Sequence, residues 1–366
     1  MKIKTVLLLG LVLTFVLTGC KAEAVPSPIA TQPPTEVVIQ ETKAIETEVP
    51  ATVAPEKTED KLTKPYSEFK IVALLSGVIT DNGWSANMYN AIMNLKEKYG
   101  LTAEYVESVS ASDMEEYLRG YATKNYDLVI AHGSQFIDAV NAVAGDFPDT
   151  LFIVSFATGK ISEFENVAGV APVGQGLLSG IVAGALTTTN KVAWLGSVEN
   201  PSISEDMKFF EPGVRLVNPD AEVITGYIGS ATDAEKGKEM AMNLISGGVD
   251  VISHQANAAG LGVLQAAEEA GILAVGVNTD QYSVAPDAVV TSVLRNFTGI
   301  YEDLFPKIAE GNFKGGVYPY GVKDGGCYLS DWHGWKEKLP AEKVKLIDDT
   351  IEGIKTDKIV VPTPGN

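Results

Sequence analysis

Residues 126–157 read YDLVIAHGSQFIDAVNAVAGDFPDTLFIVSFA, and this stretch carries the pattern from which the fold class follows. Two short apolar runs, 126–133 and 150–157, flank a segment with the polar and apolar spacing of a helix. That segment ends in Gly and Pro, which are helix stop signals. We therefore predict a strand, a helix and a second strand. Both strands are continuously apolar, as expected when helices cover both faces of a parallel sheet.

The same alternation continues on both sides of this stretch. Further apolar runs of strand length occur at 69–77, 101–107, 166–172, 191–197, 221–229, 249–255, 271–277 and 288–293. Helix-patterned segments lie between them. Repeated strand–helix alternation predicts an α/β architecture with doubly wound parallel sheets. With 366 residues, of which 45% are apolar, the chain is long enough to form two such lobes.

Two strand-to-helix junctions echo each other. NYDLVIAHGSQFID at 125–138 and GVDVISHQANAAGL at 248–261 each contain an Asp-led apolar strand that ends in His and enters a helix. This echo fits two similar lobes that face one another. Because ligands of such sheets bind outside the carboxyl ends of the strands, the residues after each run are candidate contacts. These residues are 77–85, 132–135, 157–160, 196–201, 230–233, 254–260 and 278–281.

The N-terminal residues 1–20 read MKIKTVLLLGLVLTFVLTGC. A basic start, an apolar run and a small-residue junction predict a secretory signal peptide at 1–19, and the apolar run is too short to span a membrane. Leu-x-Gly-Cys at 17–20 resembles the bacterial lipobox, which implies that Cys20 is acylated and becomes the new N-terminus. The alternative is an uncleaved membrane anchor. Either interpretation puts the rest of the chain outside the cytoplasm.

Residues 20–66 are rich in Pro, Thr, Glu, Ala and Val and show no sustained apolar period. Such a segment cannot bury enough surface to offset its ordering entropy, so we predict a disordered, lipid-anchored linker that spans roughly 40 Å. Beyond it we expect lobe 1 at 67–166, returning at about 281–311. We expect lobe 2 at 167–280, with a C-terminal segment at about 312–358.

The formal net charge is −19, and removal of residues 1–19 takes away Lys2 and Lys4 but no acid, which leaves −21. An acidic surface repels phosphate backbones and anionic headgroups, so we expect no nucleic acid partner and a neutral or cationic ligand. Cys327 is the single cysteine besides Cys20. Once Cys20 is acylated, no intrachain disulfide and no Cys-based metal site can form.

Motifs of enzyme chemistry are missing from the sequence. There is no G-x-S-x-G elbow, phosphate loop or H-E-x-x-H, and GLG at 260–262 lacks the third glycine of a dinucleotide fingerprint. His132, His254 and His333 raise the alternative of a metal triad. Separated histidines without a matching carboxylate pattern more often form hydrogen bonds or pack. We therefore expect no catalysis, no cofactor and no metal.

The segment TDNGWSANMYNAI at 80–92 follows the first strand and holds the sharpest cluster of binding groups. Trp84 suits stacking on a flat ligand, which contributes about 0.5–1.5 kcal/mol beyond the area buried. Asp81 suits a ligand hydroxyl or amine, since a hydrogen bond to a charged group contributes about 1.5–3 kcal/mol. In the alternative interpretation, Asp81 caps the helix that starts near Ser85 and Trp84 packs in the core. The spacing alone fits both.

From Phe69 to about Asp331 the chain resembles the basic membrane protein family, the purine-nucleoside-binding lipoproteins of ABC importers. The segments that carry the resemblance include TDNGWSANMYNA, QGLLSGIVAGALT, DAEKGKEMAMNLISGGVDVI and VVTSVLRN. The resemblance implies a type I periplasmic-binding-protein fold, in which a three-segment hinge joins the two lobes. It also implies a small-molecule ligand between the lobes, ABC permease subunits as partners and a membrane anchor at Cys20.

In the first lobe, Asp81 and Trp84 match the family motif D-x-x-[FW]-N, whose aromatic ring stacks on the base. Ser85 stands where the family usually has Asn. Ser134 and Gln135 match a base-recognising loop, although an aromatic residue is common at the first of these positions. The resemblance therefore implies that these five residues contact the ligand.

In the second lobe, Gly260 matches a glycine-rich turn. Asn278 replaces the first Asp of the family's G-V-D-S-D, which holds the ribose, and Asp280 keeps the second. Arg295 stands where a Lys contacts the sugar in S-V-V-K. Ala231 stands where the family usually has Phe or Trp as the second face of an aromatic sandwich.

The scaffold thus matches the family, while the ligand contacts partly differ. Loss of the second stacking ring, the ribose carboxylate and the first-lobe aromatic together would weaken nucleoside binding by several kcal/mol unless other groups compensate, and would take micromolar affinity toward millimolar. We expect an extracytoplasmic solute-binding lipoprotein of an ABC importer that captures a purine nucleoside or related heterocycle. The alternatives are a sugar or other neutral solute on the same scaffold, or a ligand-sensing subunit of a membrane receptor.

Overall fold

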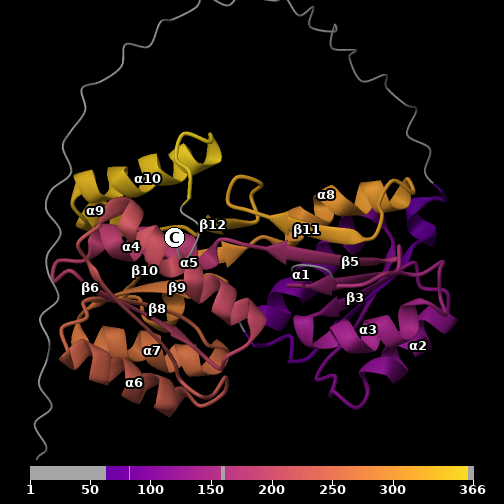
Figure 1. Ribbon diagram of the computed structural model, residues 1–366, viewed down its shortest axis with the longest axis horizontal. Coiled ribbons are helices and arrows are strands. Elements are labelled where there is room, and N and C mark those ends of the chain that lie inside the picture. The colour runs from indigo at the N-terminus through magenta and orange to yellow at the C-terminus, as the bar shows by residue number, and fades with distance from the viewer. Residues whose placement is uncertain (1–62, 82, 158–160, 362–366) are drawn as a thin grey trace, which may run out of the picture. The chain divides into compact units, whose positions relative to one another are not determined.

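The computed structural model describes residues 63–81, 83–157 and 161–361, which form two six-stranded sheets covered by helices (Figure 1). The predicted signal peptide, the lipidation residue Cys20 and all but the last four residues of the predicted linker lie outside the described residues. Within the described ranges, no helix has both the length and the apolar character that crossing a membrane requires.

The first sheet has the strand order β11-β5-β4-β3-β1-β2, and its neighbouring strands all pair in parallel. Its strands are β1 (Lys70–Leu75), β2 (Thr102–Val106), β3 (Leu128–His132), β4 (Leu151–Ser155), β5 (Val167–Pro172) and β11 (Gly316–Tyr320). The four inner strands are almost entirely buried. Their continuous apolar runs follow from helices on both faces of the sheet.

Helices from distant parts of the sequence cover this sheet. They are α1 (Trp84–Tyr99), α2 (Met114–Thr123), α3 (Ile137–Ala144) and α8 (Phe297–Ala309), with short 3-10 turns η1 (Tyr66–Glu68) and η2 (Ser134–Phe136). Successive residues of β1 point to opposite faces, so Ile71 packs in the core under α1 and α8, and Val72 in the core under α2 and α3. We call this sheet and these helices the first lobe.

The second sheet has the strand order β12-β10-β9-β8-β6-β7, and its pairs are parallel except β10 with β12. Its strands are β6 (Lys191–Gly196), β7 (Glu222–Tyr227), β8 (Val251–Gln255), β9 (Leu273–Asn278), β10 (Val289–Arg295) and β12 (Cys327–Leu329). The turn η3 (Tyr282–Val284) lies between β9 and β10.

The helices of the second lobe lie on both faces of its sheet (Figure 1). They are α4 (Gln175–Leu186), α5 (Pro201–Val217), α6 (Ala234–Ser246), α7 (Asn257–Ala270), α9 (Trp335–Lys338) and α10 (Ala341–Lys355). Helices α4, α5 and α10 share one core and α6 and α7 the other. Helices α4 and α5 approach so closely that a Cβ at Gly180 would lie 2.1 Å from the carbonyl oxygen of Phe210.

The chain crosses between the lobes three times: from β5 to α4, from β10 to α8, and from β11 to β12. The predicted α/β fold with two doubly wound lobes and a three-segment hinge is confirmed.

The sheet membership differs from the lobe boundaries expected from the sequence. Strand β5 pairs with β4 and belongs to the first sheet, so the first crossing follows Pro172 rather than residue 166. Strand β10 belongs to the second sheet, so the chain returns to the first lobe after Arg295 and not at residue 281. Strand β11 pairs with β5 in the first sheet, although it falls within 312–358. An apolar run predicts a strand but not the sheet that accepts it.

Candidate ligand-binding site

A cavity of about 560 Å³ lies at the carboxyl ends of the strands and is lined by residues of both lobes. The lining residues of the first lobe are Ser76, Trp84, Gly133, Ser134, Gln135, Ile137, Phe156 and Ala157. Those of the second lobe are Ser197, Val198, Asn200, Pro201, Ser202, Ile203, Ala231, Gln255, Asn257 and Asn278. Both the position and the size are typical of small-molecule sites in such sheets.

The lining combines apolar surface with hydroxyl and amide groups. Its polar side chains are Ser76, Ser134, Gln135, Ser197, Asn200, Ser202, Gln255, Asn257 and Asn278, and none of the described lining residues carries an ionisable side chain. An uncompensated charge would be costly to bury here, whereas amides and hydroxyls can donate to and accept from a neutral ligand. The lining therefore favours an uncharged ligand that forms hydrogen bonds.

Trp84 is the first residue of α1, and Asp81 holds the start of this helix. The Asp81 carboxylate accepts from the backbone N–H groups of Gly83 at 2.9 Å, Ser85 at 2.8 Å and Ala86 at 3.0 Å. These bonds satisfy donors at the helix N-terminus that have no partner within the helix. Asp81 is not among the lining residues of the cavity, and its carboxylate caps the helix that begins at Trp84.

The ring of Trp84 stacks on the ring of His132, with 4.0 Å between the centroids and 17° between the planes. His132 Nε2 lies 3.0 Å from the backbone oxygen of Trp84, and Nδ1 lies 2.9 Å from Ser155 Oγ. Because a carbonyl only accepts, Nε2 carries the hydrogen and Nδ1 accepts from the Ser155 hydroxyl. Burial lowers the pKa of His132 to about 3, which keeps the ring neutral.

His254 has an equivalent role in the second lobe. Its Nε2 lies 3.2 Å from Gln281 Oε1, and its Nδ1 accepts from the backbone N–H of Ala256 at 3.3 Å. Burial lowers its pKa to about 4. A Cβ at Gly260 would lie 2.0 Å from Nδ1, so Gly260 makes room for this ring. The two buried histidines support the loops that line the cavity and do not line it themselves.

Three other predicted contacts of the ligand also do not line the cavity. Ser85 is buried, and its hydroxyl has no hydrogen-bond partner among the described residues. Asp280 is exposed at the surface and pairs with His333 at 2.6 Å. Arg295 is 2% exposed, and its guanidinium is occupied by protein groups.

Of the nine residues predicted to bind the ligand, four line the cavity and five do not. Those that line it are Trp84, Ser134, Gln135 and Asn278. Those that do not are Asp81, Ser85, Gly260, Asp280 and Arg295. Ala231, where the chain lacks the second aromatic ring, does line the cavity.

Several lining residues had no role assigned from the sequence. Asn200, Gln255 and Asn257 fall within the segments after strands, and that positional rule was the signal that could have identified them. Phe156 was missed because it continues the apolar run of β4 and so fits a strand interior. Its φ of 61° turns the chain there, and no sequence pattern indicated this.

The three histidines do not come together at a metal site. His132 and His254 lie behind the cavity in different lobes, and His333 pairs with Asp280. Among the described residues, no group of three His, Cys, Asp or Glu side chains is arranged to hold a metal ion.

Known proteins resemble this chain along most of its length. Basic membrane protein A of Borreliella burgdorferi is 27% identical over 304 residues, covering 80% of this chain and 88% of that protein. The ABC transporter nucleoside-binding protein BmpA of Lactococcus lactis is 28% identical over 292 residues, covering 74% and 80%. Transcriptional activator protein med of Bacillus subtilis is 27% identical over 259 residues, covering 70% and 80%.

The fold is shared with a solved ABC transporter solute-binding protein from Aeropyrum pernix K1. The TM-score is 0.71 at 20% identity, and the match covers 81% of this chain and 94% of that chain. The family described as ABC transporter substrate-binding protein PnrA-like matches residues 69–363, which include both lobes. The predicted relationship to basic membrane proteins is therefore confirmed, and the chain belongs to the PnrA-like family of ABC transporter substrate-binding proteins.

Proposed function

We propose that this protein is an extracytoplasmic lipoprotein that captures a purine nucleoside or related heterocycle for an ABC permease. The observation that carries the proposal is a cavity between two lobes that combines the ring of Trp84 with amides and hydroxyls. The described part of its lining has no ionisable side chain. Acylation of Cys20 anchors the chain to the membrane, and the linker lets the lobes reach the permease.

The chemistry of a heterocycle fits this lining. His132 covers one face of Trp84, and the remaining surface of the ring contributes to the cavity wall. A flat ligand that stacks there gains about 0.5–1.5 kcal/mol beyond its buried area. Amide groups such as that of Gln135 offer one acceptor and two donors, which complement the ring nitrogens and exocyclic groups of a base. The nucleoside-binding name of the Lactococcus lactis relative supports the same ligand class.

Two lining residues favour weaker binding than a two-ring site would give. Ala231 offers no second ring, and Asn278 offers an amide in place of a carboxylate. The same amides and hydroxyls also suit a sugar stacked on Trp84, which is the second candidate ligand class. The name of the Bacillus subtilis relative favours a regulatory use of the bound state as a second candidate role.

Calorimetry on the full-length protein tests the ligand class. Adenosine, guanosine, inosine and their free bases form one panel, and neutral sugars form the other. We expect saturable heat with at least one purine compound and none with nucleoside monophosphates, because none of the described lining residues supplies a cation for the phosphate. Heat with sugars alone would refute the nucleoside proposal and leave the solute-binding fold intact.

A further inference from the structure

We propose that Arg295 is a positioning residue that joins the wall of the cavity to the hinge, and not a contact of the ligand. It is the last residue of β10, at the point where the chain leaves the second sheet for α8 of the first lobe. It is 2% exposed and does not line the cavity. The inference rests on the chain being a solute-binding protein, and it holds whichever small molecule is bound.

The Arg295 side chain contacts three residues of the first lobe: Pro172, Phe156 and Trp84, whose ring centroid lies 5.9 Å from Cζ. Its Nη1 donates to the backbone oxygen of Pro172 at 2.9 Å, and Pro172 is the last residue of β5, where another crossing begins. Its Cζ lies 4.1 Å from the centroid of the Phe156 ring, which lines the cavity. A guanidinium at this distance over an aromatic face is electrostatically attracted to it.

The same guanidinium is held by the second lobe. Nη2 pairs with the Asp206 carboxylate on α5, and Nε donates to Asn278 Oδ1 at 3.0 Å. The Gln255 amide bridges Arg295 and Asp206. In the orientation that satisfies both partners, its oxygen accepts from Arg295 at 2.8 Å and its nitrogen donates to Asp206 at 2.5 Å. Asn278 and Gln255 both line the cavity. The planar, permanently charged fork of Arg suits several fixed acceptors at once.

The backbone around Arg295 extends this connection. Asn87 of α1 donates through Nδ2 to the backbone oxygens of Asn278 at 3.0 Å and Arg295 at 2.8 Å, so a side chain of the first lobe binds two strand ends of the second. Asn296 N–H donates to the Gly326 oxygen at 2.9 Å, in the crossing between β11 and β12. All three crossings therefore meet at Arg295 or its neighbour.

Two of the lining residues that contact Arg295 have left-handed backbones. Phe156 has φ 61° and Asn278 has φ 65°. A bulky residue such as Phe adopts this conformation only where its surroundings hold it, and Arg295 is part of those surroundings. A ligand that presses on Phe156, Gln255 or Asn278 thus acts on groups fixed to Arg295. Rotation of one lobe against the other changes the separation of Pro172 from Asp206 and Asn278, which the same guanidinium joins.

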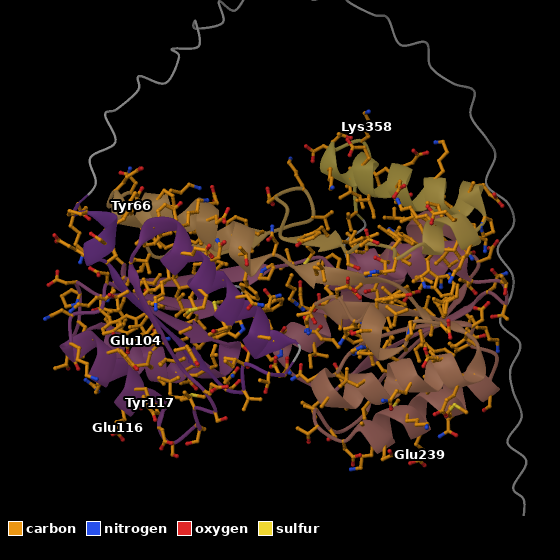
Figure 2. The ribbon with its side chains drawn as sticks, turned by 180° about the vertical axis from the view of Figure 1, so that it is seen from behind. Tyr66, Glu104, Glu116, Tyr117, Glu239 and Lys358 are labelled. Carbon is orange, nitrogen blue, oxygen red and sulfur yellow. The ribbon has the colours of Figure 1, made fainter. Side chains whose placement is uncertain are left out.

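Distance measurements between the lobes test this role. Tyr117 on α2 and Glu239 on α6 are exposed and project from different lobes, so both accept spin labels after substitution by Cys (Figure 2). The full-length chain carries Cys20→Ser, and Cys327 is fully buried with its thiol pKa raised to about 12, so neither competes for label. Double electron–electron resonance then reports the distribution of lobe separations, first without ligand and then with inosine as probe.

Without ligand, we expect Arg295→Met to broaden the distribution of lobe separations by about twofold. The substitution removes the hydrogen bonds through which the guanidinium joins the lobes, so more relative positions of the lobes become populated. Arg215→Met is the matched control. Arg215 donates to Glu211 and to the backbone oxygens of Pro219 and Ala221, all within the second lobe. Loss of Arg215 should lower stability and leave the distribution unchanged.

A second variant covers the case in which Arg295→Met does not fold. Replacing the ion pair by apolar residues, in Arg295→Met with Asp206→Leu, avoids an unpaired buried charge and preserves folding in comparable pairs. It still removes the bonds to Pro172 and Asn278. A folded double variant with a broadened distribution supports the inference, and one with the wild-type distribution overturns it. Failure of inosine to bind the wild type would exclude inosine as a ligand, and the ligand-free comparison would still decide the role of Arg295.

Discussion

His132 lies flat beneath Trp84, with 4.0 Å between the ring centroids, and it also binds the backbone oxygen of the same residue at 3.0 Å. One side chain therefore fixes both the ring and the main chain of the residue proposed to stack on the ligand. Burial lowers the pKa of His132 to about 3 and keeps the imidazole neutral, so Nδ1 accepts from Ser155 while Nε2 donates to the Trp84 oxygen.

Trp84→Ala should weaken binding of the purine found by calorimetry at least about tenfold, since one lost stacking contact and its burial amount to roughly 1.4 kcal/mol. Trp335→Ala is the matched control, because Trp335 is a partly buried Trp of α9 that does not line the cavity. Equal dissociation constants for wild type and Trp84→Ala would contradict the stacking role.

The two buried histidines should make the protein less stable as the pH falls. Their pKa values drop from 6.5 to about 3 in His132 and about 4 in His254, so the unfolded chain binds protons that the folded chain does not. The free energy of unfolding should therefore fall below about pH 6.5, by up to about 1.4 kcal/mol per pH unit for each histidine. Urea unfolding at several pH values between about 5 and 6.5 measures this slope.

His132→Phe is the control for that slope. It keeps a ring against Trp84 and removes the titrating nitrogens. The slope of unfolding free energy against pH should therefore fall by the amount that corresponds to about one bound proton. An unchanged slope would show that the His132 imidazole does not titrate as its burial requires.

Ala231→Trp and Asn278→Asp test where the lining departs from the family pattern. Ala231→Trp should tighten purine binding if the added ring fits the cavity, because it supplies a second stacking face.

Asn278→Asp should favour ribosides over free bases, since one carboxylate oxygen can stay with Arg295 and the other can accept from the sugar hydroxyls. Calorimetry that shows no preference of Asn278→Asp for inosine over hypoxanthine would reject the second expectation.

Cys20→Ser should move the protein from the membrane fraction to the soluble fraction without changing ligand affinity, because more than 40 residues separate Cys20 from the first strand. Cell fractionation followed by immunoblotting measures the distribution, with the wild type as the reference. Retention of the variant on membranes after a salt wash without detergent would exclude the lipid anchor.

The architecture could be predicted from the sequence because a strand that is buried on both faces of its sheet is apolar at every position. Inner strands such as β3 and β8 are continuous apolar runs, and their spacing predicted the alternation with helices. Membership of a sheet depends on pairing between distant segments, and therefore the exchange of β5, β10 and β11 between the expected lobes was not visible.

The site was predictable only as a set of positions. Residues after strands do line the cavity, since parallel strands bring their carboxyl ends together. The direction of each side chain was not predictable. The Asp81 carboxylate accepts hydrogen bonds from three backbone N–H groups, and the exposed Asp280 pairs with His333. Arg295 is held by an ion pair with a residue 89 positions away, which no local pattern indicates.

The contact between His254 and Gly260 constrains which sequences this lobe accepts. With only 2.0 Å between Nδ1 and a Cβ placed on Gly260, no larger residue fits there while the imidazole stays. The two positions should therefore vary together among homologues. The double change His254→Ser with Gly260→Ala would remove the steric clash. It would also remove the hydrogen bond between His254 and Gln281. Random mutagenesis of the glycine alone should return almost no folded variants.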